Sequence, residues 1–337
     1  MFLGIRVTAH AGEPSKRLPC FRRVRGRGVK EVGLRLRILF VLLLAAPTGL
    51  PAEDIVAEAL KSFPPETVRL EYSNSAKLRQ LPNYERLRQR YLAPQIRKLE
   101  KSLTQLSIQE ADVDEVALGW KSGSSGLDLY GLATGRFSAK AISDGAAGKG
   151  LAPVQIAGLN AYCFEPDAAA TCVAVLGDSL GAFGSRTSLG SMLQARAGSA
   201  ASLGSNSRFK TVLDEASKES PIWGVAVGPG VSDWFKGSMP GQENLELDWS
   251  QAFANVEALS YNVDAADKVR LDIRLDCTTQ AAAAGLRQVL DGLKSFQKLA
   301  WENQHPNQPN PFQTLEVDSS GQRVNLKLTT AYATLGG

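Results

Sequence analysis

The sequence predicts an α+β protein of two related β-α-β-β-α-β units, each ferredoxin-like, with antiparallel sheets and helices packed on one face. Three observations lead to this fold class. Strand patterns alternate with helical patterns along residues 53–337, the order recurs in two halves, and several strand patterns alternate apolar with polar side chains. Such alternation is typical of antiparallel strands that expose one face. The order of elements in each half is that of the split βαβ motif.

The first unit is predicted over residues 53–176. It begins with a strand at 67–72 and continues with a helical segment at 75–106, which Pro82 and Pro94 interrupt. Either proline can open a new helix, because proline is tolerated at the first helical position. The other predicted elements are strands at 113–121 and 127–133, a helix at 138–147, and strands near residues 154, 161 and 173.

The second unit is predicted over residues 221–337. It contains a strand at 222–227, a short helix at 231–236 and a hairpin of strands at 254–263 and 269–277. Thr278 or Thr279 can cap the next helix, since a threonine hydroxyl accepts from free amides of a first turn. That helix is expected to place one set of apolar residues on one face: Leu286, Val289, Leu290, Leu293, Phe296 and Ala300. Paired strands at 315–317 and 324–328 complete the unit.

Residues 177–220 lie between the two units and are dominated by Gly, Ser and Ala. This composition predicts a connector. The segment is expected to contain helices near 189–196 and 209–217.

The N-terminal region is typical of an export signal. Arg35 and Arg37 precede an apolar run at 38–46, which is followed by a Pro/Gly break and by Ala52. This is the order of a secretory signal peptide, so residues 1–52 are predicted to be a presequence. The apolar run is far shorter than the ~20 residues of a spanning helix, and no transmembrane anchor is expected after cleavage. We therefore expect an exported protein, either periplasmic or extracellular.

The charge of the chain changes when this presequence is set aside. Residues 1–52 contain ten of the 38 Lys and Arg but only two of the 34 Asp and Glu, which leaves a net charge of about −4. Binding to nucleic acid depends on neutralising phosphates with basic residues. The sequence therefore predicts no nucleic-acid partner.

Three cysteines follow the presequence. Cys163 and Cys172 lie on two short predicted strands around a Glu-Pro-Asp turn, so in an oxidising compartment we expect them to form a disulfide. The alternative is two free core thiols. Cys277 ends an alternating strand on its apolar face and is expected to be a buried thiol. One histidine and three dispersed cysteines do not make a zinc site, and neither a calcium loop nor any cofactor motif stands out.

Basic residues crowd the helical segment after the first strand. They are Arg79, Arg86, Arg88, Arg90, Arg97, Lys98 and Lys101. One interpretation is a solvated face opposite the leucines of the same helices. The other is an attachment surface for anionic lipid or for an envelope polymer.

Several stretches resemble a group of bacterial exported proteins of unknown function. They are "FPPETVRLEY", "GRFS", "CVAVLGD", "SLGSNSRFKTVL" and "SPIWGVAVG", and the similarity spans roughly residues 63–332. The resemblance implies duplicated split βαβ units and an envelope setting. With it, the sequence predicts a non-catalytic exported envelope protein that acts as a binding or structural module and needs no cofactor.

A second resemblance points to an enzyme. Gly177-Asp178-Ser179-Leu180 is similar to the signature of the GDSL esterases and lipases, and implies Ser179 as nucleophile. His305 would be the base, with Glu302 in the place of the family's aspartate. Against this hypothesis, the family has its serine after the first strand of a parallel sheet, whereas Ser179 follows at least four predicted strands, several of them antiparallel in pattern.

Overall fold

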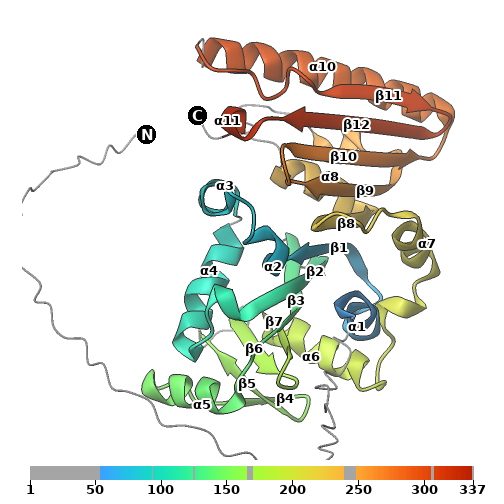
Figure 1. The fold of residues 1–337 in the computed structure, drawn as a ribbon. Helices are drawn as coiled ribbons and strands as arrows, with labels where there is room; N and C mark the ends of the chain where they lie inside the picture. Colours follow the sequence, from blue (N-terminus) through green and yellow to red (C-terminus); the bar gives the residue numbers. More distant parts are fainter. Residues whose placement is uncertain are drawn as a thin grey trace, which may run out of the picture. The chain divides into compact units, whose positions relative to one another are not determined.

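The computed structural model describes residues 54–92, 94–123, 126–164, 170–238, 248–304 and 307–335. The predicted presequence 1–52, including the apolar run 38–46, lies outside the described residues. The described residues form helices and a 12-stranded sheet in which all neighbouring strands are antiparallel (Figure 1). This confirms the α+β class and the antiparallel pairing.

Most strands follow the predicted positions, but Leu180–Ser185 forms a strand inside the segment 177–220, where only helices were expected. In chain order the strands are β1 (Thr67–Asn74), β2 (Val113–Gly123), β3 (Gly126–Gly135), β4 (Val154–Ile156), β5 (Leu159–Cys163), β6 (Thr171–Val175), β7 (Leu180–Ser185), β8 (Ile222–Val227), β9 (Val256–Asp264), β10 (Val269–Cys277), β11 (Glu316–Ser320) and β12 (Arg323–Thr330).

The order of the strands differs from the expected pair of ferredoxin-like sheets. The sheet runs β11-β12-β10-β9-β8-β1-β2-β3-β7-β6-β5-β4 without a break, and no duplication of a ferredoxin-like unit is shown. The reason is β1, which pairs with β2 on one side and with β8 on the other. Alternation of side chains determines which face of a strand is buried, but it leaves the choice of neighbouring strand open.

Helices precede, separate and follow these strands in the chain. They are α1 (Ile55–Ser62), α2 (Ser75–Leu78), α3 (Tyr84–Tyr91), α4 (Pro94–Leu103), α5 (Ala139–Gly148), α6 (Arg186–Arg196), α7 (Ser207–Glu215), α8 (Pro229–Ser238), α9 (Trp249–Ala252), α10 (Gln280–Gln304) and α11 (Tyr332–Leu335). Pro94 opens α4 as predicted, and the Thr279 hydroxyl accepts from the Ala282 amide at 3.0 Å at the start of α10.

One face of the sheet, here called the core face, carries the largest hydrophobic core of the first half. Strand residues Leu70, Tyr130 and Leu132 are fully buried there against α1, α6 and α7. Phe63 meets Tyr130 edge to face at 5.2 Å, and the Tyr130 hydroxyl is hydrogen-bonded to the Thr67 hydroxyl at 2.7 Å. Both α6 and α7 come from residues 177–220, so this segment supplies core as well as connection.

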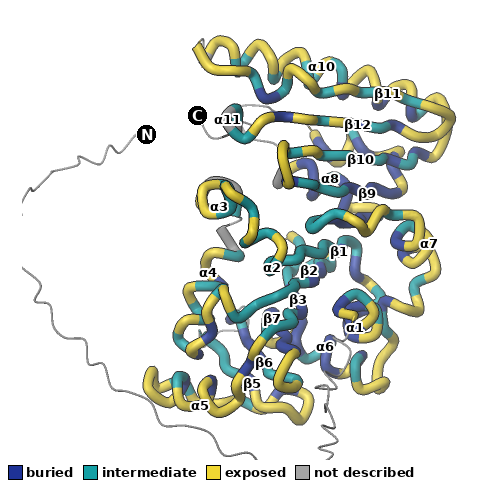
Figure 2. Tube along the Cα trace, in the orientation of Figure 1, coloured by how far each residue is buried: buried dark blue, intermediate teal, exposed yellow. Residues whose placement is uncertain are grey.

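The other face, here called the cavity face, is covered by α4, α5, α8, α9 and α10. Helices therefore lie on both faces of the sheet, whereas the sequence predicted them on one. Figure 2 shows the buried positions gathered along the strands and on the inner sides of the helices. In the second half the core face stays polar, and Arg274 pairs there with Asp276 at 3.0 Å and with Glu215 at 2.6 Å.

Helix α10 corrects one detail of the predicted apolar face. Leu286 and Leu290 are buried against β10, β11 and β12, and Leu293 packs beside them. Val289 and Phe296 are instead 40% and 47% exposed. The predicted face spanned too wide an arc of the helix, because a helix that covers one sheet edge buries a narrower stripe. In the described part of the chain, no helix is both long and apolar enough to cross a membrane.

Cys163 and Cys172 form a disulfide between β5 and β6, where the two residues are register partners. The expected pairing is thus confirmed, and the turn between the strands falls at 165–169, outside the described residues. Cys277 is a buried free thiol, as predicted. The bond closes a short loop, with a sequence separation of nine.

We predict that reduction of this disulfide lowers the free energy of unfolding by about 2 to 3 kcal/mol, because the bond restricts the unfolded chain. Urea unfolding of the protein with and without reductant measures the difference. The paired variant Cys163→Ser/Cys172→Ser is the control, since its stability should not respond to reductant. Equal stability of the oxidised and reduced parent protein would contradict the prediction.

Candidate functional site

The cavity face forms the floor of an apolar cavity of about 720 Å³ that is partly open to solvent. Its floor is formed by side chains from strands across most of the sheet, among them Val116, Leu118, Ala133, Phe183, Leu271 and Ile273. These residues occupy alternate positions on their strands, and the paired registers bring them to the same face. The floor is therefore the apolar side of the sheet where the covering helices leave it free.

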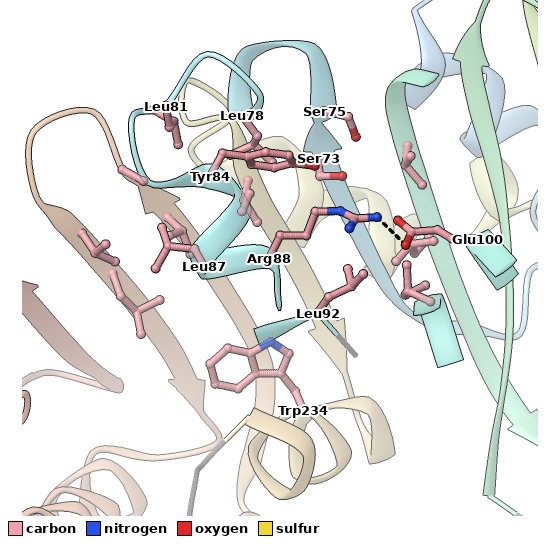
Figure 3. Close-up of a pocket in the computed structure, with 18 of the residues that line it drawn as sticks. Ser73, Ser75, Leu78, Leu81, Tyr84, Leu87, Arg88, Leu92, Glu100 and Trp234 are labelled. Atoms are coloured by element: carbon pink, nitrogen blue, oxygen red, sulfur yellow. Dashed lines mark hydrogen bonds and ion pairs between the residues drawn. The ribbon is translucent and has the colours of Figure 1, made fainter. Parts of the chain in front are cut away.

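One wall of the cavity comes from α2, α3 and α4. Leu78, Leu81, Leu87 and Leu92 are among its lining residues and point into it from these helices and their connections (Figure 3). Their spacing gives one apolar side to each short helix, whereas Arg86, Arg97 and Lys101 are exposed. This wall is the apolar face that the sequence predicted opposite the basic residues.

Polar side chains hold the helices of this wall together and attach them to the segment before β2. Arg88 on α3 donates to Glu100 on α4 at 2.5 Å, which ties the two helices together (Figure 3). The Tyr84 hydroxyl donates to Glu110 at 2.7 Å. Burial raises the pKa of Tyr84, and the hydrogen bond to Glu110 raises it further. Each side chain is thus satisfied at the edge of an otherwise apolar surface.

The opposite wall comes from α8 and α10. Trp234 on α8 lines the cavity (Figure 3), and α10 contributes Leu290, Leu293, Lys294 and Gln297. The ring centroid of Trp234 lies 4.9 Å from that of Tyr261 in β9, which holds the indole against the sheet. This wall is aromatic and aliphatic, with Lys294 and Gln297 as polar members.

A partly buried ion cluster ties α8 to the sheet. Arg69 of β1 pairs with Glu71 on the same strand and with Asp233 on α8, the latter at 3.4 Å. Its guanidinium carbon also lies 4.2 Å from the centroid of the Trp120 ring. Gly230 allows the close approach of α8, since a Cβ atom there would lie 2.5 Å from the Val68 carbonyl oxygen.

The predicted basic surface divides into inward and outward residues. Arg79 donates to the carbonyl oxygens of Glu110 and Val113, so it anchors the start of β2. Arg88 is engaged with Glu100 inside the helical wall. The exposed members are Arg86, Arg97, Lys98 and Lys101, and the side chain of Arg90 lies outside the described part.

Two residues of the hydrolase hypothesis, Ser179 and Glu302, lie in separate parts of the described fold. Ser179 is exposed in the tight turn between β6 and β7, and its carbonyl oxygen accepts from the Gly135 amide at 3.0 Å. Glu302 is exposed on α10, which packs on β10, β11 and β12 near the other end of the strand order. His305 lies outside the described residues. Among the described residues, no group of His, Cys, Asp and Glu could hold a metal ion.

The cavity itself was not predicted from the sequence. The leucines of α2 to α4 and the alternating strands give apolar faces, but such faces most often form packed core. Trp234 and Lys294 carry no local signal that sets them apart. Only the distance between the helices and the sheet distinguishes a cavity from a filled core, and that distance depends on tertiary packing.

Comparisons with known proteins define the fold only coarsely. No protein-family model and no curated protein matches the chain. Two crystal forms of TP0453, a Treponema pallidum protein, are similar in structure. Form I gives a TM-score of 0.48 at 12% identity, covering 82% of this chain and 93% of that one, and form IV gives 0.45 at 11% identity, covering 82% and 94%. Similarities this weak carry no inference about function.

We predict that Arg88→Met loosens α3, because it removes the ion pair to Glu100 and leaves that carboxylate without its cation. Hydrogen exchange of the α3 amides should be about fivefold faster, as expected for a loss of about 1 kcal/mol in local stability. Arg86→Met is the matched control, because Arg86 is exposed on the same helix. Equal exchange in the two variants would show that the ion pair does not hold α3.

Proposed function

We propose that this chain is a non-catalytic exported protein that binds an elongated apolar molecule, such as a lipid acyl chain, in the apolar cavity. The observation that carries the proposal is the cavity of about 720 Å³ between the cavity face and the helices α3, α4, α8 and α10. Its volume falls within the range of roughly 300 to 1,000 Å³ that is usual for ligand sites.

The lining of the cavity favours an apolar occupant. The cavity is partly open to solvent, so water can enter it when no ligand is bound. Water in a cavity needs polar partners, and most of this lining does not offer them. An apolar ligand that displaces this water is therefore favoured.

The hydrophobic effect supplies enough affinity for such a ligand. Each buried methylene contributes about 0.8 kcal/mol, so about ten of them contribute about 8 kcal/mol. This corresponds to a dissociation constant near one micromolar before the cost of ordering the chain is subtracted. A single hydrogen bond contributes far less, so the class of ligand is decided mainly by apolar surface.

An envelope setting agrees with this function. The disulfide between Cys163 and Cys172 is consistent with an oxidising compartment, and the presequence predicts export. The exposed residues Arg86, Arg97 and Lys101 lie on the helices that form the leucine-rich wall. We propose that this basic surface meets anionic lipid or envelope polymer, which would bring the cavity close to its ligand.

The test is binding of N-phenyl-1-naphthylamine, an uncharged apolar fluorophore, followed by its fluorescence. The parent protein should bind it with micromolar affinity. Ala133→Trp should weaken binding at least tenfold, because the indole would fill space on the cavity floor. Thr329→Trp is the matched control, since Thr329 is exposed on β12 and is not among the lining residues.

Retained binding in a folded Ala133→Trp protein would contradict the proposal, as would no binding by the parent. If Ala133→Trp does not fold, Leu328→Trp takes its place, because Leu328 also lines the cavity and precedes the control position on the same strand.

A further inference from the structure

The charged residues that line the cavity differ in whether they have a partner within the protein. In the described part of the chain there are four of them, Arg88, Glu100, Glu110 and Lys294. Arg88 pairs with Glu100, and Glu110 accepts from Arg79 at 3.2 Å and from the Tyr84 hydroxyl. Both carboxylates therefore already have donors.

Lys294 is different. Within the described residues it has neither an ion pair nor a side-chain hydrogen bond, although it is half-buried on α10. It follows Leu290 and Leu293, which line the same wall, and it lines the cavity itself, so its aliphatic stem can lie along apolar surface and its ammonium group can reach the cavity opening. The cavity thus presents one cation that the described protein does not neutralise.

Gln297 adds a second donor close to this cation. It lies three residues after Lys294 on α10 and lines the cavity as well. Residues three apart are neighbours on a helix surface, so the amide and the ammonium group can act on one ligand group. The nearby carboxylates have other partners: Glu100 and Glu110 are engaged elsewhere, and Asp291, three residues before Lys294, pairs with Arg287 at 3.6 Å.

We infer that the ligand of the cavity is an amphiphile with an anionic oxygen headgroup, a carboxylate or a phosphate, which Lys294 binds with help from Gln297. The inference rests on the proposed function, because the apolar chain of the same molecule occupies the cavity. Hydrogen bonds between a charged donor and a charged acceptor are about twice as strong as neutral ones, so the headgroup adds selectivity to the affinity that the chain provides.

The test compares three molecules with the same saturated chain: hexadecanoate, hexadecyl phosphate and hexadecanol. Each competes with bound N-phenyl-1-naphthylamine below its critical micelle concentration at pH 8. In the parent protein one or both anions should compete about tenfold more tightly than the alcohol. Lys294→Met should remove that preference and leave the affinity for the alcohol unchanged. Lys298→Met is the matched control, because Lys298 is exposed on the same helix and is not among the lining residues.

The possible outcomes test the anionic headgroup separately from the proposed binding of an apolar molecule. A preference for hexadecanoate alone assigns a fatty carboxylate, and a preference for hexadecyl phosphate assigns a lipid phosphate. Equal competition by all three molecules, or a preference that survives in Lys294→Met, overturns the inference and leaves the apolar site in place. Failure of the fluorophore and of all three molecules to bind overturns the proposed function itself.

Discussion

The pairing of β1 with β8 is the constraint on which the rest of the structure depends. β1 follows α1 near the start of the described chain, and β8 begins about 150 residues later, yet Arg69 to Ser73 align with Ala226 to Ile222 in one antiparallel ladder. The ladder joins the strands of both halves into one sheet. As a result, the apolar side of the sheet is continuous from β6 to β12, and one cavity can extend over strands from both halves.

The same strand also holds one wall of the cavity in place. Arg69 on β1 pairs with Glu71 on the same strand and with Asp233 on α8. Ser73, two positions after Glu71, lines the cavity. The Asp233 side chain is 40% exposed, so its pair with Arg69 contributes up to about 1 kcal/mol to holding α8. The wall of α3 and α4 is fastened by the pair of Arg88 with Glu100, which is also partly exposed.

Local features of the fold followed from the sequence. Alternating residues in β9 and β10, the proline that opens α4, the Thr279 cap and the pairing of Cys163 with Cys172 each depend on neighbours in the chain or on one hairpin. Strand order did not follow, because β1 pairs with β8 across a large loop and several registers would satisfy the same alternation. The basic residues were recognised as a group, but only the fold separates Arg79 and Arg88, which have internal partners, from Arg86 and Lys101, which are exposed.

Neither the cavity nor the place of Lys294 in it could be predicted from the sequence, and the reason is physical. A leucine that lines a cavity and a leucine that fills a core obey the same periodicity. What differs is the space between elements, and this depends on where α8 and α10 lie relative to α3 and α4. The GDSL motif shows the opposite case, in which a local pattern suggested chemistry. The fold uses it as a turn between β6 and β7, with Ser179 exposed and its backbone bonded to Gly135.

The most direct test of the central claim asks where a bound chain lies. A brominated fatty acid quenches the fluorescence of tryptophans that it touches. Trp234 and Trp301 line the cavity, whereas Trp223 is buried on the core face. The account predicts strong quenching that is largely lost in Trp234→Phe/Trp301→Phe and retained in Trp223→Phe. Quenching that survives in the double variant, or is lost only with Trp223, would place the chain elsewhere and contradict the account.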